Sequence, residues 1–76
     1  MSGEVKLLDT VALLEDVQAD GVPLKRGEVG AVVEILAPQV YEVEFCDDQG
    51  HAYAFASLHA DQLLVLHNQG KESLAA

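Results

Sequence analysis

The sequence has few basic residues. Four Lys and Arg side chains stand against 13 Asp and Glu, which gives a formal net charge of −9 at pH 7. Proteins that bind nucleic acids or anionic membranes use clusters of Lys and Arg to neutralise phosphates, and the only adjacent bases here are Lys25 and Arg26. The charge therefore argues against nucleic acids and membranes as partners and is compatible with a protein partner that carries a basic patch.

Cysteine is also scarce, because Cys46 is the only one in the 76 residues. A disulfide within the chain is excluded, and a lone thiol fits a reducing compartment, so we expect a cytoplasmic protein. No apolar run approaches the roughly 18 residues that a membrane helix needs, and we expect no secretory leader at the start. A chain of this length forms one domain at most, with a thin core.

Short apolar and alternating segments predict an all-β fold. Residues 41–46 (YEVEFC) are the clearest strand, since three apolar residues alternate with two glutamates. Other strands are expected at 10–14, 30–36, 52–58 and 63–66. We expect a long loop over 15–28, a hairpin turn over 47–50 and a tight 3₁₀ turn over 59–62. This order describes a five-stranded SH3-like barrel with a long first loop.

The barrel is expected to occupy residues 5–67, with flexible segments at 1–4 and 68–76. The apolar faces of the expected strands indicate which residues form the core. These are Val11, Leu13, Val33, Ile35, Val43, Phe45 and Leu64.

Four segments resemble those of a family of short, uncharacterised bacterial proteins: residues 6–15 (KLLDTVALLE), 24–36 (LKRGEVGAVVEIL), 41–45 (YEVEF) and 60–66 (ADQLLVL). The resemblance covers roughly residues 5–66. It supports the fold and implies no activity. Residues 25–45 are also similar to the SH3-like barrel of the nitrile hydratase β subunit and its small accessory proteins.

Several residues invite a chemical role, but structural roles explain them better. His51, His59 and His67 lack the close pairing that metal ligands show, so we expect no metal site. Cys46 is followed by two aspartates, which disfavour the thiolate that a nucleophile needs. We therefore expect no catalytic residue, no cofactor and no small-molecule substrate.

Two loop segments and one acidic face also have plain structural interpretations. Residues 47–50 (DDQG) lack the spacing of a calcium loop, and residues 25–30 (KRGEVG) lack the pattern of a phosphate-binding loop, so both are expected to be turns. Glu34, Glu42 and Glu44 fall on outward positions of adjacent strands. We interpret them as a solvated face in preference to a docking site for a basic partner.

The segment over residues 52–58 (AYAFASL) has apolar or small residues on both faces, and a small barrel can bury one of them. The pattern does not decide which face is buried. We therefore expect a non-catalytic protein-interaction module, self-associating as a dimer or bound to another protein, with an accessory subunit of an enzyme as the alternative. The candidate interface residues are Tyr53, Phe55, Ala52, Ala54, Ala56 and Leu58.

Overall fold

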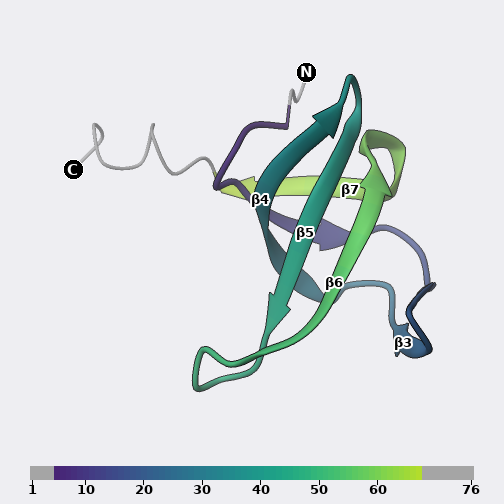
Figure 1. The fold of residues 1–76 in the computed structure, drawn as a ribbon, viewed down its shortest axis with the longest axis vertical. Helices are drawn as coiled ribbons and strands as arrows, with labels where there is room; N and C mark the ends of the chain where they lie inside the picture. The colour runs from purple at the N-terminus through teal and green to yellow at the C-terminus, as the bar shows by residue number, and fades with distance from the viewer. Residues whose placement is uncertain (1–4, 68–76) are drawn as a thin grey trace.

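Residues 5–67, the part of the chain that the computed structural model describes, consist largely of strands (Figure 1). The five-stranded antiparallel sheet contains β1 (Thr10–Leu13), β4 (Val29–Ala37), β5 (Val40–Cys46), β6 (Ala52–His59) and β7 (Leu63–His67). The 3₁₀ turn η1 (Ala60–Gln62) precedes β7. The predicted all-β class, five main strands and 3₁₀ turn are confirmed, while the predicted flexible segments 1–4 and 68–76 lie outside the described residues.

The strands of the sheet follow the order β6-β5-β4-β1-β7, so β4, β5 and β6 form a meander and β1 joins it to β7. In Figure 1, β1 and β7 run across the direction of β5 and β6, because the sheet is strongly twisted and coiled. The sequence predicts the same order of elements: one strand, a long connection, a meander, a 3₁₀ turn and a closing strand. Within residues 5–67 there is no helix that could span a membrane by its length and apolar character.

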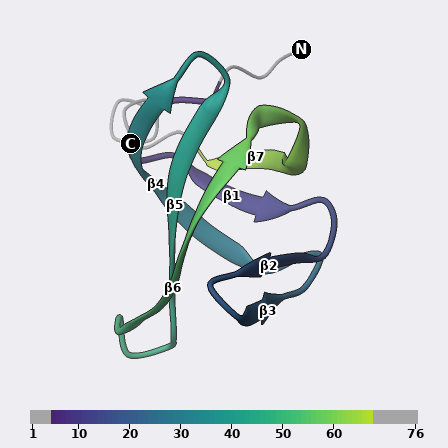
Figure 2. The ribbon, with the colours of Figure 1, turned by 45° about the vertical axis from the view of Figure 1, so that its right-hand side comes forward.

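The long first connection contains regular structure that the sequence reading treated as loop. Strands β2 (Val17–Ala19) and β3 (Val22–Leu24) form a separate two-stranded sheet (Figure 2). The two residues between them, Asp20 and Gly21, have φ angles of 52° and 83°. Two-residue hairpin loops favour such left-handed pairs, and Asp-Gly is among the sequences that adopt them most readily.

The core lies between the inward faces of the curved sheet. Val11, Leu13, Val43 and Phe45 are fully buried, as predicted. The inward residues of β6 pack into the same cluster, together with Leu24 of the β2–β3 hairpin. Phe45 is the largest side chain among the fully buried ones, so the core is centred on β5.

Three predicted core residues are wrong: Val33, Ile35 and Leu64 are exposed. On β4 a register shift between Val32 and Glu34 leaves Val33 as an extra residue, so Val32 takes the inward position instead. Ile35 lies beyond this irregularity, toward the exposed β4–β5 turn. On β7 Leu63 faces inward opposite Leu13, which directs Leu64 outward.

Gly30 explains why the face with fewer apolar residues is the inward face of β4. A Cβ atom at this position would lie 2.8 Å from Val43 Cγ1, 2.8 Å from the Glu44 carbonyl oxygen and 3.0 Å from Phe45 Cδ2. These distances are below ordinary van der Waals contact, so a larger residue would push β4 away from the core side chains of β5. The close approach lets Val32 reach the core.

The neighbouring valines test this register. Val32 is 0% exposed and Val33 is 37% exposed, so Val32→Ala should lower the free energy of unfolding by about 2 kcal/mol. Val33→Ala should change it by less than about 1 kcal/mol. Urea unfolding of both variants measures the difference. Equal losses, or a larger loss for Val33→Ala, would contradict the observed register of β4.

Candidate interaction surfaces

Strand β6 divides its residues between the core and the outer surface. Ala54, Ala56 and Leu58 are buried, so they are not available to a partner, whereas Tyr53, Phe55 and Ser57 point outward. Ala52 is exposed at the start of the strand. The structure thus shows which face of β6 is buried, a point that the sequence pattern left open. The interface prediction remains a prediction, and it now concerns Tyr53, Phe55 and Ala52.

Tyr53 is held in one orientation by a neighbouring carboxylate. Its hydroxyl donates a hydrogen bond to Glu28 Oε1 at 2.7 Å, and Glu28 Oε2 accepts one from the Lys25 backbone N–H at 2.8 Å. The Tyr53 ring also lies 6.5 Å, centroid to centroid, from Phe45 in the core. A half-exposed ring that is fixed in this way offers contact surface at little cost in side-chain entropy.

The same hydrogen bond shifts the pKa values of both partners. The hydrogen bond to Glu28, with loss of hydration, raises the pKa of Tyr53 to about 12. The hydrogen bonds from Tyr53 and then from the Lys25 backbone lower the pKa of Glu28. On the alkaline side, the stability that the Tyr53–Glu28 hydrogen bond contributes is fully present up to about pH 10. It is lost as the pH rises through the raised pKa of Tyr53. On the acid side it is lost as the pH falls through the lowered pKa of Glu28.

Phe55 lies between two hollows that separate β6 from the β2–β3 hairpin. One cavity of about 320 Å³ is lined by Phe55, Ser57, Glu42 and Gln18, among others. The other, of about 270 Å³, is lined by Phe55, Tyr53 and Val22 and neighbouring residues. Ala19 and Asp20 of the hairpin line both. The two cavities therefore form one groove that follows the outer edge of β6.

A second apolar surface lies on the outward side of β4, β1 and β7. Ala12 of β1 faces outward because Val11 and Leu13 face the core, and it pairs with Val29 on one side and Leu64 on the other. Around it are four large side chains, each about half exposed, which we call the aliphatic face: Leu14, Val29, Leu64 and Leu66. This face was not predicted from the sequence, because Leu64 was expected in the core.

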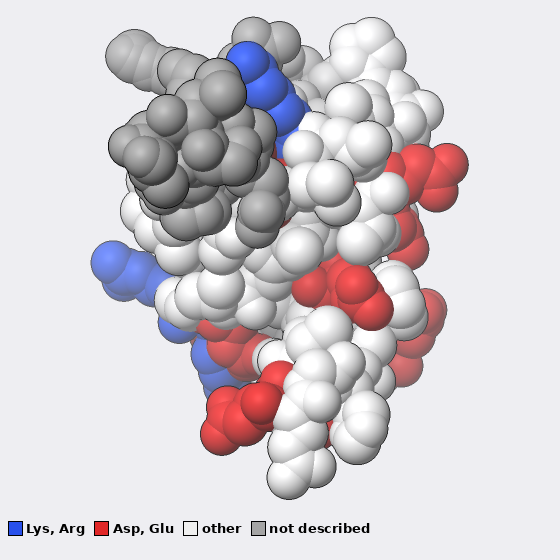
Figure 3. Space-filling model, turned by 90° about the vertical axis from the view of Figure 1, so that its left-hand side faces the viewer, with Lys and Arg blue, Asp and Glu red and all other residues white. Residues whose placement is uncertain are grey.

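Acidic side chains lie on the outward side of β4 and β5, beside β6. Glu34 of β4 pairs directly with Glu42 of β5, and Glu44 pairs with Ala31 on one side and Phe55 on the other. The Ser57 hydroxyl donates to Glu42 Oε1 at 3.0 Å. Figure 3 shows a face with Asp and Glu on its right side and in its lower part, Lys and Arg mainly on its left, and uncharged residues between them. The predicted acidic face is therefore real and runs beside Phe55.

The two loops that might resemble ligand sites are turns whose polar groups are engaged. Asp47 Oδ1 accepts hydrogen bonds from the backbone N–H groups of Gln49 and His51, both at 2.9 Å, and Gly50 has a φ of 84°. In the other turn, the Arg26 N–H donates to Asp16 Oδ1 at 2.8 Å. The backbone donors that would bind a phosphate there are partly used by the protein itself.

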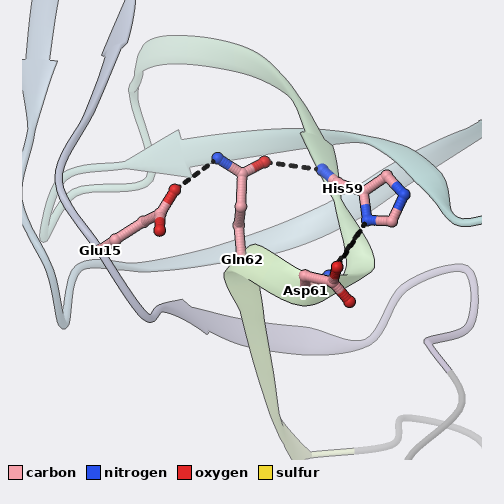
Figure 4. Close-up of polar contacts among 4 residues, drawn as sticks. All are labelled: Glu15, His59, Asp61 and Gln62. Carbon is pink, nitrogen blue, oxygen red and sulfur yellow. Dashed lines mark hydrogen bonds and ion pairs between the residues drawn. The ribbon is translucent and has the colours of Figure 1, made fainter.

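His59 and Cys46 also have structural surroundings. His59 Nδ1 accepts from the Asp61 N–H at 3.4 Å, and the Gln62 amide accepts from the His59 N–H and donates to Glu15 (Figure 4). Within residues 5–67 no three His, Cys, Asp or Glu side chains form a group that could hold a metal ion. Reduced hydration, followed by the charges of Glu44 and Asp47, raises the pKa of the Cys46 thiol, which makes it a poor nucleophile.

Comparison with known proteins places the chain in one family. Residues 7–65 match DUF4926, a domain of unknown function. The match covers more than half of the chain, which therefore belongs to this family. No curated protein and no solved structure matches it.

The Tyr53–Glu28 contact gives a prediction about titration. Replacing the carboxylate in Glu28→Gln should move the pKa of Tyr53 from about 12 toward 10, the value of an ordinary tyrosine, because the negative acceptor is lost. Ultraviolet absorbance measures the ionisation, and Tyr53→Phe identifies the step that belongs to Tyr53. Glu34→Gln removes the same charge elsewhere and serves as the control. A wild-type Tyr53 that titrates near 10 would contradict the hydrogen bond.

Proposed function

We propose that this DUF4926 domain is a non-catalytic protein-interaction module that self-associates through its aliphatic face. The observation that carries the proposal is the cluster of half-exposed aliphatic side chains on β4, on β7 and directly after β1. Contiguous apolar surface on a small domain marks a contact site more often than it remains in water. A second copy, related by a two-fold axis, is the simplest way to cover it.

Charge favours this face over β6 for a contact between identical copies. Each chain has a net charge of −9, and like charges brought together across an interface oppose association. The residues of the aliphatic face are uncharged, whereas Phe55 is flanked by Glu42, Glu44 and Asp20. Two copies that met at β6 would bring these acids together.

The expected affinity is modest. Burying the exposed half of a leucine contributes on the order of 1 kcal/mol, and association must first overcome the loss of translational and rotational freedom. Four such residues on each copy contribute on the order of 8 kcal/mol before this cost, so the contact should form at about millimolar concentrations. A non-catalytic role is supported by the carboxylates of Asp16 and Asp47, which accept hydrogen bonds from backbone N–H groups in turns. The negative charge also opposes nucleic acids as partners.

Self-association is tested by light scattering over a concentration series that reaches the millimolar range. The mass of the wild-type protein should rise with concentration toward twice the monomer mass of 8.1 kDa. Leu64 is 51% exposed, so Leu64→Asp should leave the fold intact and yield monomers, because the added carboxylate would be desolvated in the contact. Leu36→Asp is the matched control: it makes the same change at an exposed leucine near the opposite end of β4 and should remain dimeric.

Two results would overturn this proposal. A wild-type mass of 8.1 kDa at these concentrations would refute self-association. Dissociation by Phe55→Asp together with a dimeric Leu64→Asp would move the contact to β6, where the sequence reading placed it.

A further inference from the structure

We propose that the groove between β6 and the β2–β3 hairpin binds an extended, basic peptide segment of another protein, which adds to the edge of β6 as a further strand. The inference rests on the proposed role as an interaction module and names a second partner at a different surface. Three features of the groove carry it: the unpaired strand edge, the exposed aromatic rings and the sign of the charges.

Strand β6 is an edge strand with little protection against pairing. It is the outermost strand of the sheet beside β5, and the β2–β3 hairpin next to it belongs to a separate sheet. Alternate backbone N–H and C=O groups of an antiparallel strand point away from its partner. Natural edge strands are commonly protected by charged residues, proline or bulges. Residues 52–58 (AYAFASL) contain neither a charge nor a proline, and the register shift of β6, which leaves Tyr53 as an extra residue, lies at the start of the strand. Residues 54–58 therefore form a regular edge without such protection.

The groove has the length that an added strand needs. Its two cavities together are lined by β6 residues from Ala52 to Leu58. The part of β6 in regular register, residues 54–58, can pair with roughly five extended residues at about 3.3 Å each. The hairpin forms the opposite wall with Ala19 and Asp20. Strand addition to an exposed sheet edge is a recurring mode of peptide recognition, in which main-chain hydrogen bonds supply affinity and pockets supply specificity.

The aromatic rings give the groove two anchor points. Phe55 is 49% exposed and lines both cavities. Tyr53 lines one of them, with its hydroxyl engaged by Glu28, so the surface that it offers is mainly its ring. The faces of aromatic rings bind apolar side chains and also attract Lys and Arg side chains through cation–π contacts.

The charges determine the chemistry of the partner. The residues lining the two cavities that are charged at neutral pH are Asp20 and Glu42, both acidic, and Glu44 pairs with Phe55 across the sheet. Among the described residues that line the groove there is no Lys or Arg. A peptide with basic side chains would therefore be favoured over an acidic one, and over a second copy of this acidic chain.

The test uses the full chain and a fluorescein-labelled heptapeptide in which Lys and Val alternate, read by fluorescence anisotropy. The peptide should bind, and the counterpart with Glu in place of Lys should bind at least about tenfold more weakly. N-methylation of alternate backbone nitrogens should also weaken binding, because it removes strand hydrogen bonds. Raising the salt concentration should weaken binding through screening.

Variants locate the site. Phe55→Ala should weaken binding about tenfold or more, and Asp20→Asn and Glu42→Gln should each weaken it about threefold. Asp61→Asn removes the same charge from the exposed turn η1, outside the groove, and should leave the affinity unchanged. Amide chemical shifts of the wild-type chain should change along residues 52–58 and 19–22 when the peptide is added, which reports the site without any substitution.

Several outcomes would overturn the inference. These are an absence of binding at millimolar peptide, equal binding of the basic and acidic peptides, equal losses for Asp20→Asn and Asp61→Asn, or shift changes confined to other strands. Conversion of the dimer to monomers by Phe55→Ala would identify a second copy as the occupant of the groove. The aliphatic face and self-association are measured separately by Leu64→Asp, so that proposal can stand if the peptide fails to bind.

Discussion

The close packing of β4 against β5 at Gly30 is the constraint on which the rest of the structure depends. Because Gly30 has no side chain, Val43 and Phe45 can occupy the space where a Cβ atom would lie. Val32 then reaches the core, and Val29 and Val33 on the alternate positions face outward. Pairing of Val29 with Ala12, and of Ala12 with Leu64, carries this orientation across β1 to β7. The aliphatic face is thus a consequence of how the core is packed.

The sequence predicts the strands well where polarity alternates. On β5, Tyr41, Val43 and Phe45 alternate with glutamates, and both the strand and its buried face are confirmed. On β4 the pattern misleads, because Ala31, Val33 and Ile35 are together more apolar than Gly30, Val32 and Glu34. The buried face there depends on a steric contact of Gly30 and on an extra residue at Val33, and neither produces a periodic signal.

The inward faces of β6 and β7 could not be predicted from the periodicity of apolar residues either. Strand β7 reads LLVLH, so no alternation shows which leucine faces inward. The two faces of β6 are both apolar, and the bulk of Tyr53 and Phe55 excludes neither orientation. The β2–β3 hairpin could have been found: Asp20-Gly21 lies between short apolar segments, which is a strong hairpin signal. The hairpin forms one wall of the groove beside β6. Because the hairpin was not predicted, the groove was not predicted either.

The two surfaces lie at opposite ends of the strand order of one small sheet and suit different partners. The aliphatic face is uncharged, which suits a second acidic copy, and the groove is bordered by Asp20, Glu42 and Glu44, which suits a basic segment. Self-association through the aliphatic face is the central claim. Isotope-filtered NMR on a mixture of labelled and unlabelled chains tests it most directly, because it detects contacts between copies alone. We expect intermolecular contacts at the methyl groups of Leu14, Val29 and Leu64. Contacts confined to Tyr53 and Phe55, or none at millimolar protein, would rule out self-association through the aliphatic face.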